Sequence, residues 1–152
     1  PPVRFLQNDF RTCVYSSFAS CLFFLGHEGL ATYLHSISHW NSGKVQNIKA
    51  LDLSITDYSK RKGKQKLGYK NKWVFRRANI DILNLNGLLD GQPTLCILEG
   101  SDGGTEHAIT IYDHWIFDSN LKYAIPLTRA SLVWCCMCSY VCIASAVSYE
   151  FE

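Results

Sequence analysis

The sequence predicts an α+β domain in which helices come first and an antiparallel sheet follows. Apolar residues recur at helical spacing near the beginning of the chain, whereas short β-branched and aromatic runs fill its last third. A segment containing glycine and proline, 90–93, separates the two patterns. We therefore expect a single domain over 1–152, with a helical part over about 1–90 and a sheet part over about 91–152.

Size and composition restrict the class of protein. The chain has 152 residues, of which 47% are hydrophobic and 18% are charged, and this excludes a disordered chain. No apolar run approaches the roughly 20 residues that span a bilayer, so we expect no membrane span. The chain starts at Pro1 and Pro2 without Met, which favours a domain excised from a longer polypeptide.

The seven cysteines are an odd number. Four of them crowd one end of the chain, where disulfides would close only tiny loops: Cys135, Cys136, Cys138 and Cys142. Buried thiols in a reduced compartment therefore fit better than three disulfides, and an intracellular location is slightly favoured. The spacing does not match a paired zinc knuckle, so packing is the expected role of this cluster.

The first helix is expected over 13–25, with Gly26 just beyond its end. Its apolar residues recur at helical spacing, and four small residues would let a neighbouring backbone approach it closely: Ser16, Ser17, Ala19 and Ser20. A second helix is expected over 28–39 and a third over 45–55.

The segment 58–80 holds nine basic side chains and no acidic one, so the remainder of the chain is net acidic. A solvated surface loop over 58–72 is the favoured interpretation, and contact with nucleic acid or an acidic partner through 58–80 is the alternative. Between this loop and the sheet, we expect a helix around 78–84 and a turn at 86–87.

The sheet is expected to begin with a buried strand over 94–98, followed by a glycine loop over 100–104. A hairpin follows, with strands over 108–112 and 115–118 and a tight turn at Asp113 and His114. The last elements are then a short capped helix over 128–135 and one or two strands over 139–149.

Cys13 is the main candidate for a catalytic residue, and it lies where the first helix begins. The positive end of a helix dipole and unpaired backbone N–H groups favour a thiolate there. Gln7 lies six residues earlier and could hold an amide N–H beside the sulfur.

A base for this thiol is available at His107, where the strand after the glycine loop begins. In the expected hairpin, His107 lies across from Asp118 or Asn120, which share parity and project to the same face. Either side chain could accept the imidazole N–H and leave the other ring nitrogen for the Cys13 proton. The parity argument does not choose between them.

At these residues the sequence resembles the papain-like cysteine peptidases. The matching pattern is Gln7, then Cys13 with Ser17-Phe18-Ala19 following, then Glu106-His107-Ala108-Ile109, then Asp118-Ser119-Asn120. The short gap from His107 to Asp118 looks most similar to the bacteriocin-leader-processing, or double-glycine, branch. The resemblance covers both halves of the site and leaves about 40–90 unmatched.

The resemblance implies a papain-like fold and hydrolysis of peptide bonds in a protein or peptide substrate, such as a precursor or polyprotein. It implies Cys13 as the nucleophile, His107 as the base, Asp118 as the orienting residue with Asn120 as the alternative, and Gln7 as the oxyanion-hole donor. No metal or organic cofactor would be required. A catalytically silent or acyl-transferring member of the same fold, an isopeptidase, or a basic-loop nucleic-acid-binding module remain alternatives.

Overall fold

The computed structural model describes residues 1–7, 12–38, 51, 53–55, 57–58, 73–79, 85, 92–100, 106–136 and 138–146. Helix α1 (Cys13–Phe24) and helix α2 (Glu28–Ile37) form where the apolar spacing predicts them. Gly26 lies between them with a φ of +89°, a conformation that an L side chain would resist, and this ends α1 as expected. His39, the expected last residue of the second helix, lies outside the described residues.

The third expected helix is described only at its end. Residues 51, 53–55 and 57–58 are helical, and Leu51 and Ile55 are fully buried against α1 and α2. Residues 57–58 are thus helical, whereas we had assigned Tyr58 to the basic loop. Residues 45–50 and 59–72 lie outside the described residues, and with them most of the basic segment.

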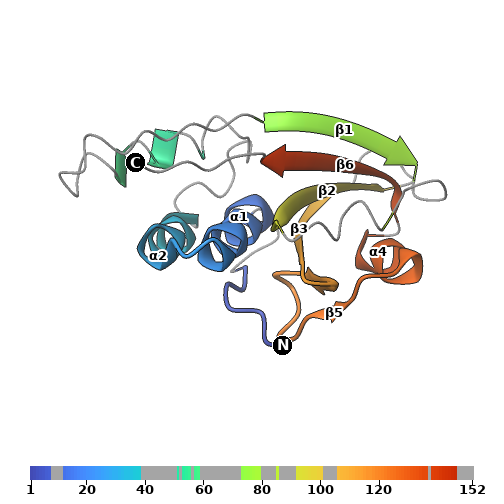
Figure 1. Ribbon diagram of the computed structural model, residues 1–152, viewed down its shortest axis with the longest axis horizontal. Helices are drawn as coiled ribbons and strands as arrows, with labels where there is room; N and C mark the ends of the chain where they lie inside the picture. The colour runs from blue at the N-terminus through green and yellow to red at the C-terminus, as the bar shows by residue number, and fades with distance from the viewer. Residues whose placement is uncertain are drawn as a thin grey trace.

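One antiparallel sheet joins the later part of the chain, with the strand order β1-β6-β2-β3-β4-β5 (Figure 1). Its strands are β1 (Trp73–Asn79), β2 (Thr94–Gly100), β3 (Glu106–Tyr112), β4 (Trp115–Phe117), β5 (Ile125–Pro126) and β6 (Cys138–Ala146). The last helix, α4 (Arg129–Cys136), comes between β5 and β6. Helices and an antiparallel sheet together confirm the α+β class.

Strand β1 corrects two of our expectations. The helix expected around 78–84 is wrong at residues 78 and 79, which belong to the strand, and 80–84 lie outside the described residues. The helical part over about 1–90 therefore contains a strand. The reason is non-local: β1 pairs with β6 along its whole length, from Trp73↔Ala146 to Asn79↔Tyr140. A partner more than sixty residues downstream leaves no local period in the sequence.

The expected hairpin is confirmed. Strands β3 and β4 pair in the register Thr110↔Phe117, and the turn residues Asp113 and His114 have φ values of 50° and 66°. Positive φ at both central residues suits the right-handed twist of the two strands. Helix α4 is capped as expected, because Thr128 Oγ1 accepts a hydrogen bond of 3.0 Å from the backbone N–H of Ser131.

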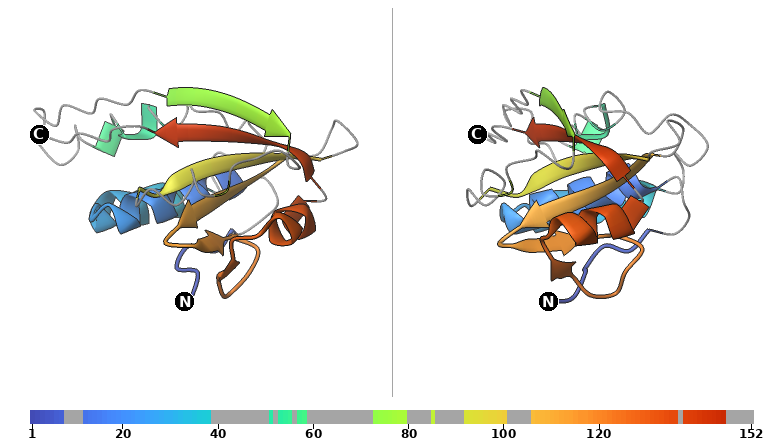
Figure 2. Two further views of the ribbon diagram at one scale, coloured as in Figure 1. Left: turned by 45° about the vertical axis from the view of Figure 1, so that its right-hand side comes forward. Right: turned by 90° about the vertical axis from the view of Figure 1, so that its right-hand side faces the viewer.

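Strands β2 and β3 separate two apolar clusters, because successive side chains of a strand point to opposite faces. Leu95 and Ala108 pack with α1 on one face. Ile109 and Ile111 pack with Leu132 of α4 on the other. Figure 2 shows α1 and α4 on opposite sides of this strand pair. Across the described ranges, no helix has the length and apolar character required to cross a bilayer.

Candidate functional site

Helix α1 is fixed to β3 by hydrogen bonds at Ser17 and Cys21. Ser17 Oγ donates to the carbonyl oxygen of Ala108 over 3.0 Å, and Thr110 Oγ1 donates to the carbonyl oxygen of Ser17 over 2.5 Å. The Cys21 thiol also meets Thr110 Oγ1 at 3.6 Å. The close approach expected from the small residues of this helix is confirmed, and it sets the first turn of α1 relative to the beginning of β3.

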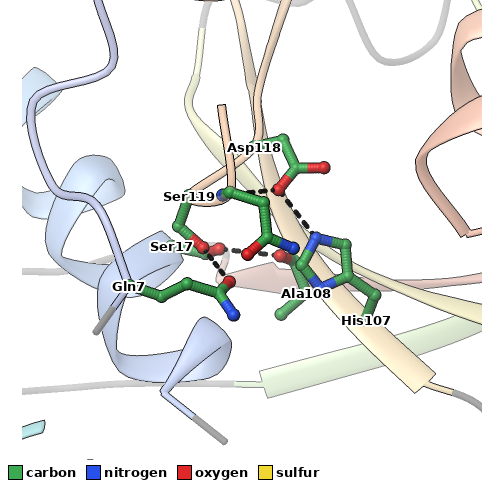
Figure 3. A network of polar contacts seen from close by, with 7 residues as sticks. Gln7, Ser17, His107, Ala108, Asp118 and Ser119 are labelled. Carbon is green, nitrogen blue, oxygen red and sulfur yellow. Dashed lines mark hydrogen bonds and ion pairs between the residues drawn. The ribbon is translucent and has the colours of Figure 1, made fainter. Parts of the chain in front are cut away.

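The side chain of His107 lies at that beginning and contacts Asp118, which directly follows β4. His107 Nε2 lies 2.8 Å from Asp118 Oδ1, and both side chains are at most 10% exposed (Figure 3). The backbone N–H of Asn120 donates to the same carboxylate oxygen over 2.9 Å. Of the two candidates that the sequence left open, Asp118 is therefore the one bonded to His107, and Asn120 supports Asp118 through its backbone.

Cys13, the first residue of α1, forms a side-chain hydrogen bond with His107. The imidazole thus interacts with both the Cys13 thiol and the Asp118 carboxylate. Both Cys13 and His107 are only 8% exposed, and low solvent access strengthens the interaction between charged groups. Residues 8–11 and 101–105, the latter including most of the glycine loop, lie outside the described residues.

Two opposing effects set the pKa of His107. Burial lowers it, but hydrogen bonds and charge interactions with Asp118 and Cys13 outweigh burial and raise the pKa to about 9. Burial raises the pKa of Asp118, whereas His107, the Asn120 N–H and the Cys135 thiol lower it, and the net shift is downward. At neutral pH the site therefore holds an imidazolium beside a carboxylate.

Gln7 is bound to the residue that follows Asp118. Its backbone N–H donates to the carbonyl oxygen of Ser119 over 3.0 Å, and Ser119 Oγ donates to its Oε1 over 2.6 Å. Gln7 therefore belongs to the same polar network as His107 and Asp118 (Figure 3). All four predicted site residues, Gln7, Cys13, His107 and Asp118, thus belong to one set of adjoining contacts.

Cys135 is the residue that sequence reasoning missed. We expected it only to pack; it does pack against the cluster under α4, and its thiol also forms a hydrogen bond with Asp118. The Thr128 cap fixes where α4 begins, but the sequence does not tell which face of α4 meets the sheet. Among the described residues, no group of three or more His, Cys, Asp or Glu side chains is suited to a metal ion.

The site therefore joins a thiol, an imidazole and a carboxylate in series, with an amide in the adjoining network. In comparisons with known proteins, no family model, no curated protein and no solved structure matches the chain.

Proposed function

We propose that the chain is a cysteine peptidase of papain-like fold, with Cys13 as its nucleophile. The observation that carries this proposal is the position of His107, whose imidazole contacts both the Cys13 thiol and the Asp118 carboxylate. A nucleophile, a base and a group that orients the base are the minimum for covalent catalysis by a thiol.

In the acylation step, the sulfur of Cys13 attacks the carbonyl carbon of a peptide bond, and an S–C bond forms as the carbonyl oxygen gains negative charge. His107, which holds the proton, transfers it to the nitrogen of the leaving amine as the C–N bond breaks. Asp118 keeps the ring in the orientation that this transfer needs, and its charge stabilises the imidazolium. The products are a thioester on Cys13 and a free amine.

In the deacylation step, His107 takes a proton from water, and the resulting hydroxide attacks the thioester carbon. The C–S bond breaks and the acid is released, while the proton remains on His107 and the thiolate on Cys13. The amide N–H of Gln7 stabilises the oxyanion in both steps, and removal of one such donor typically costs about 2.7–4 kcal/mol of transition-state stabilisation.

The proposal is tested by incubating the wild-type chain with an unfolded protein such as reduced casein and identifying new amino termini by mass spectrometry. We expect new termini with the wild type and none with Cys13→Ala, which should remain folded because it removes only one sulfur atom. Addition of a primary amine to the mixture separates hydrolysis from acyl transfer, because transfer would yield products that carry the amine. Cleavage that persists in Cys13→Ala would refute the proposal.

A further inference from the structure

We propose that Ser119 is a positioning residue that fixes the orientation of the Gln7 amide, so that its NH₂ group and not its oxygen faces the oxyanion. This inference rests on the proposed function, since it concerns the oxyanion formed during acylation and deacylation. It assigns to Ser119 a role that is separate from those of Cys13, His107 and Asp118.

Two hydrogen bonds join Gln7 and Ser119. Gln7 N donates to the backbone oxygen of Ser119 over 3.0 Å, and Ser119 Oγ donates to Gln7 Oε1 over 2.6 Å. The first bond fixes the backbone of Gln7, and the second fixes its side chain. Ser119 is only 3% exposed, so water competes little for the hydroxyl.

Backbone hydrogen bonds also hold the residues that precede Gln7. Val3 N donates to the carbonyl oxygen of Lys122 over 2.9 Å, and Ala124 N donates to that of Pro1 over 2.8 Å. The segment 1–7 thus runs antiparallel to 119–124, and His35 Nε2 lies 2.6 Å from the Leu6 oxygen on the helix side. With the backbone held, rotation of the terminal amide is the freedom that Ser119 removes.

The orientation of this amide decides whether Gln7 stabilises or destabilises the oxyanion. An amide presents an acceptor oxygen on one side and a donor NH₂ group on the other, and the two have nearly the same shape. The Ser119 hydroxyl donates to the amide oxygen of Gln7, so the amide nitrogen of Gln7 points away from Ser119, as Figure 3 shows. A flipped amide would set its oxygen against the developing oxyanion and repel it.

The turn that carries Ser119 also carries Asp118. The Asn120 N–H donates to Asp118 Oδ1, and the Leu121 N–H donates to the Asp118 carbonyl oxygen, each over 2.9 Å. One rigid turn therefore holds the group that orients the imidazole and, in the next residue, the group that orients the amide donor.

Two reactions of Cys13 test the inference, because only one of them forms an oxyanion. Acylation by p-nitrophenyl acetate passes through a tetrahedral oxyanion and releases p-nitrophenolate, whereas alkylation by iodoacetamide displaces iodide and forms none. We expect Ser119→Ala to slow acylation about 10-fold and to leave the alkylation rate of Cys13 unchanged. Ser119→Thr, which keeps the hydroxyl, should restore the acylation rate.

A double-mutant cycle separates positioning from a general structural role. In the Gln7→Ala background the hydroxyl has no amide to orient, so Ser119→Ala should change acylation less than about 2-fold. Ser36→Ala is the control, because the Ser36 hydroxyl donates to the Tyr33 carbonyl oxygen within its own helix, and the variant should behave as wild type.

Equal losses from Ser119→Ala with and without Gln7, or equal losses in acylation and alkylation, would overturn the inference. Wild-type protein in which Cys13 reacts with neither reagent would instead refute the proposed function. The two failures are therefore distinguishable in the same set of measurements.

Discussion

The two faces of the β2–β3 strand pair are built differently. On the face toward α1, the Ser17 hydroxyl donates to the strand backbone and the Thr110 hydroxyl donates to the helix backbone. On the face toward α4, apolar side chains pack around Leu132, and the Cys135 thiol bonds Asp118. By strand alternation His107 belongs to the α4 side, yet its ring also contacts Cys13 of α1.

This difference indicates that the two faces have separate roles, one in positioning side chains and the other in stability. Hydrogen bonds are directional, so the α1 face fixes the position of Cys13, the proposed nucleophile, whereas apolar packing stabilises the fold with less directional demand. The site forms at the end of the sheet where Cys13, from the α1 face, contacts His107, which belongs to the α4 face. Variants on each face can test this division.

The largest expected loss of stability comes from the apolar face. Leu132→Ala would empty a fully buried position and should lower the free energy of unfolding by about 2–5 kcal/mol. Thr110→Val keeps the volume and removes the hydroxyl that bonds Ser17, so it should cost about 1–3 kcal/mol. Urea unfolding compares the two variants. A greater loss from Thr110→Val would reverse our assignment of stability to the α4 face.

The next effect is the pH dependence of stability. The folded pKa of His107 is raised to about 9 from 6.5, so its contribution is fully present below pH 6.5 and is lost as pH rises through 9. That contribution is on the order of 3 kcal/mol. Thermal unfolding between pH 6 and 10 should show this decline in the wild type and a flatter curve in His107→Ala. Curves that run parallel would contradict the buried ion pair.

A smaller effect is expected at Cys135, where the α4 face reaches the site. Cys135→Ala removes a donor to Asp118 and so weakens the downward shift of its pKa. Stability that depends on ionised Asp118 is lost as pH falls through the folded pKa, and this loss should begin at a higher pH in the variant. Cys135→Ser, which retains a donor, should behave like the wild type. Acid titration followed by circular dichroism distinguishes these outcomes.

The smallest effect concerns two adjacent serines on α1. Ser16 is fully buried, and among the described residues its hydroxyl has no hydrogen-bond partner, whereas the Ser17 hydroxyl bonds Ala108. Ser16→Ala should leave the melting temperature unchanged or raise it slightly, and Ser17→Ala should lower stability by about 1 kcal/mol. Equal effects would show that the helix does not depend on the Ser17 bond.

Sequence reasoning succeeded where the signal was local. Helical spacing placed α1 and its end at Gly26, and turn residues placed the β3–β4 hairpin. The hairpin register in turn put His107 opposite the segment that contains Asp118 and Asn120. The choice between these two needed the conformation of the turn, which directs the Asn120 N–H toward Asp118.

Sequence reasoning failed where the determining contact was distant. Strand β1 was not predicted, and its last two residues were assigned to a helix around 78–84, because its partner β6 lies far along the chain. The role of Cys135 was missed because it depends on which face of α4 meets the sheet. The bond between Ser119 and Gln7 joins residues 112 positions apart, and no periodicity records such a contact.

The most direct test of the central claim is the rate at which iodoacetamide labels each cysteine, with and without His107→Ala. Cys21 and Cys96 are fully buried and should not react, and Cys135 is a partly exposed internal reference. We predict rapid labelling of Cys13 that falls steeply in His107→Ala, while labelling of Cys135 stays the same. Labelling of Cys13 that is no faster than that of Cys135, or that does not depend on His107, would contradict the account.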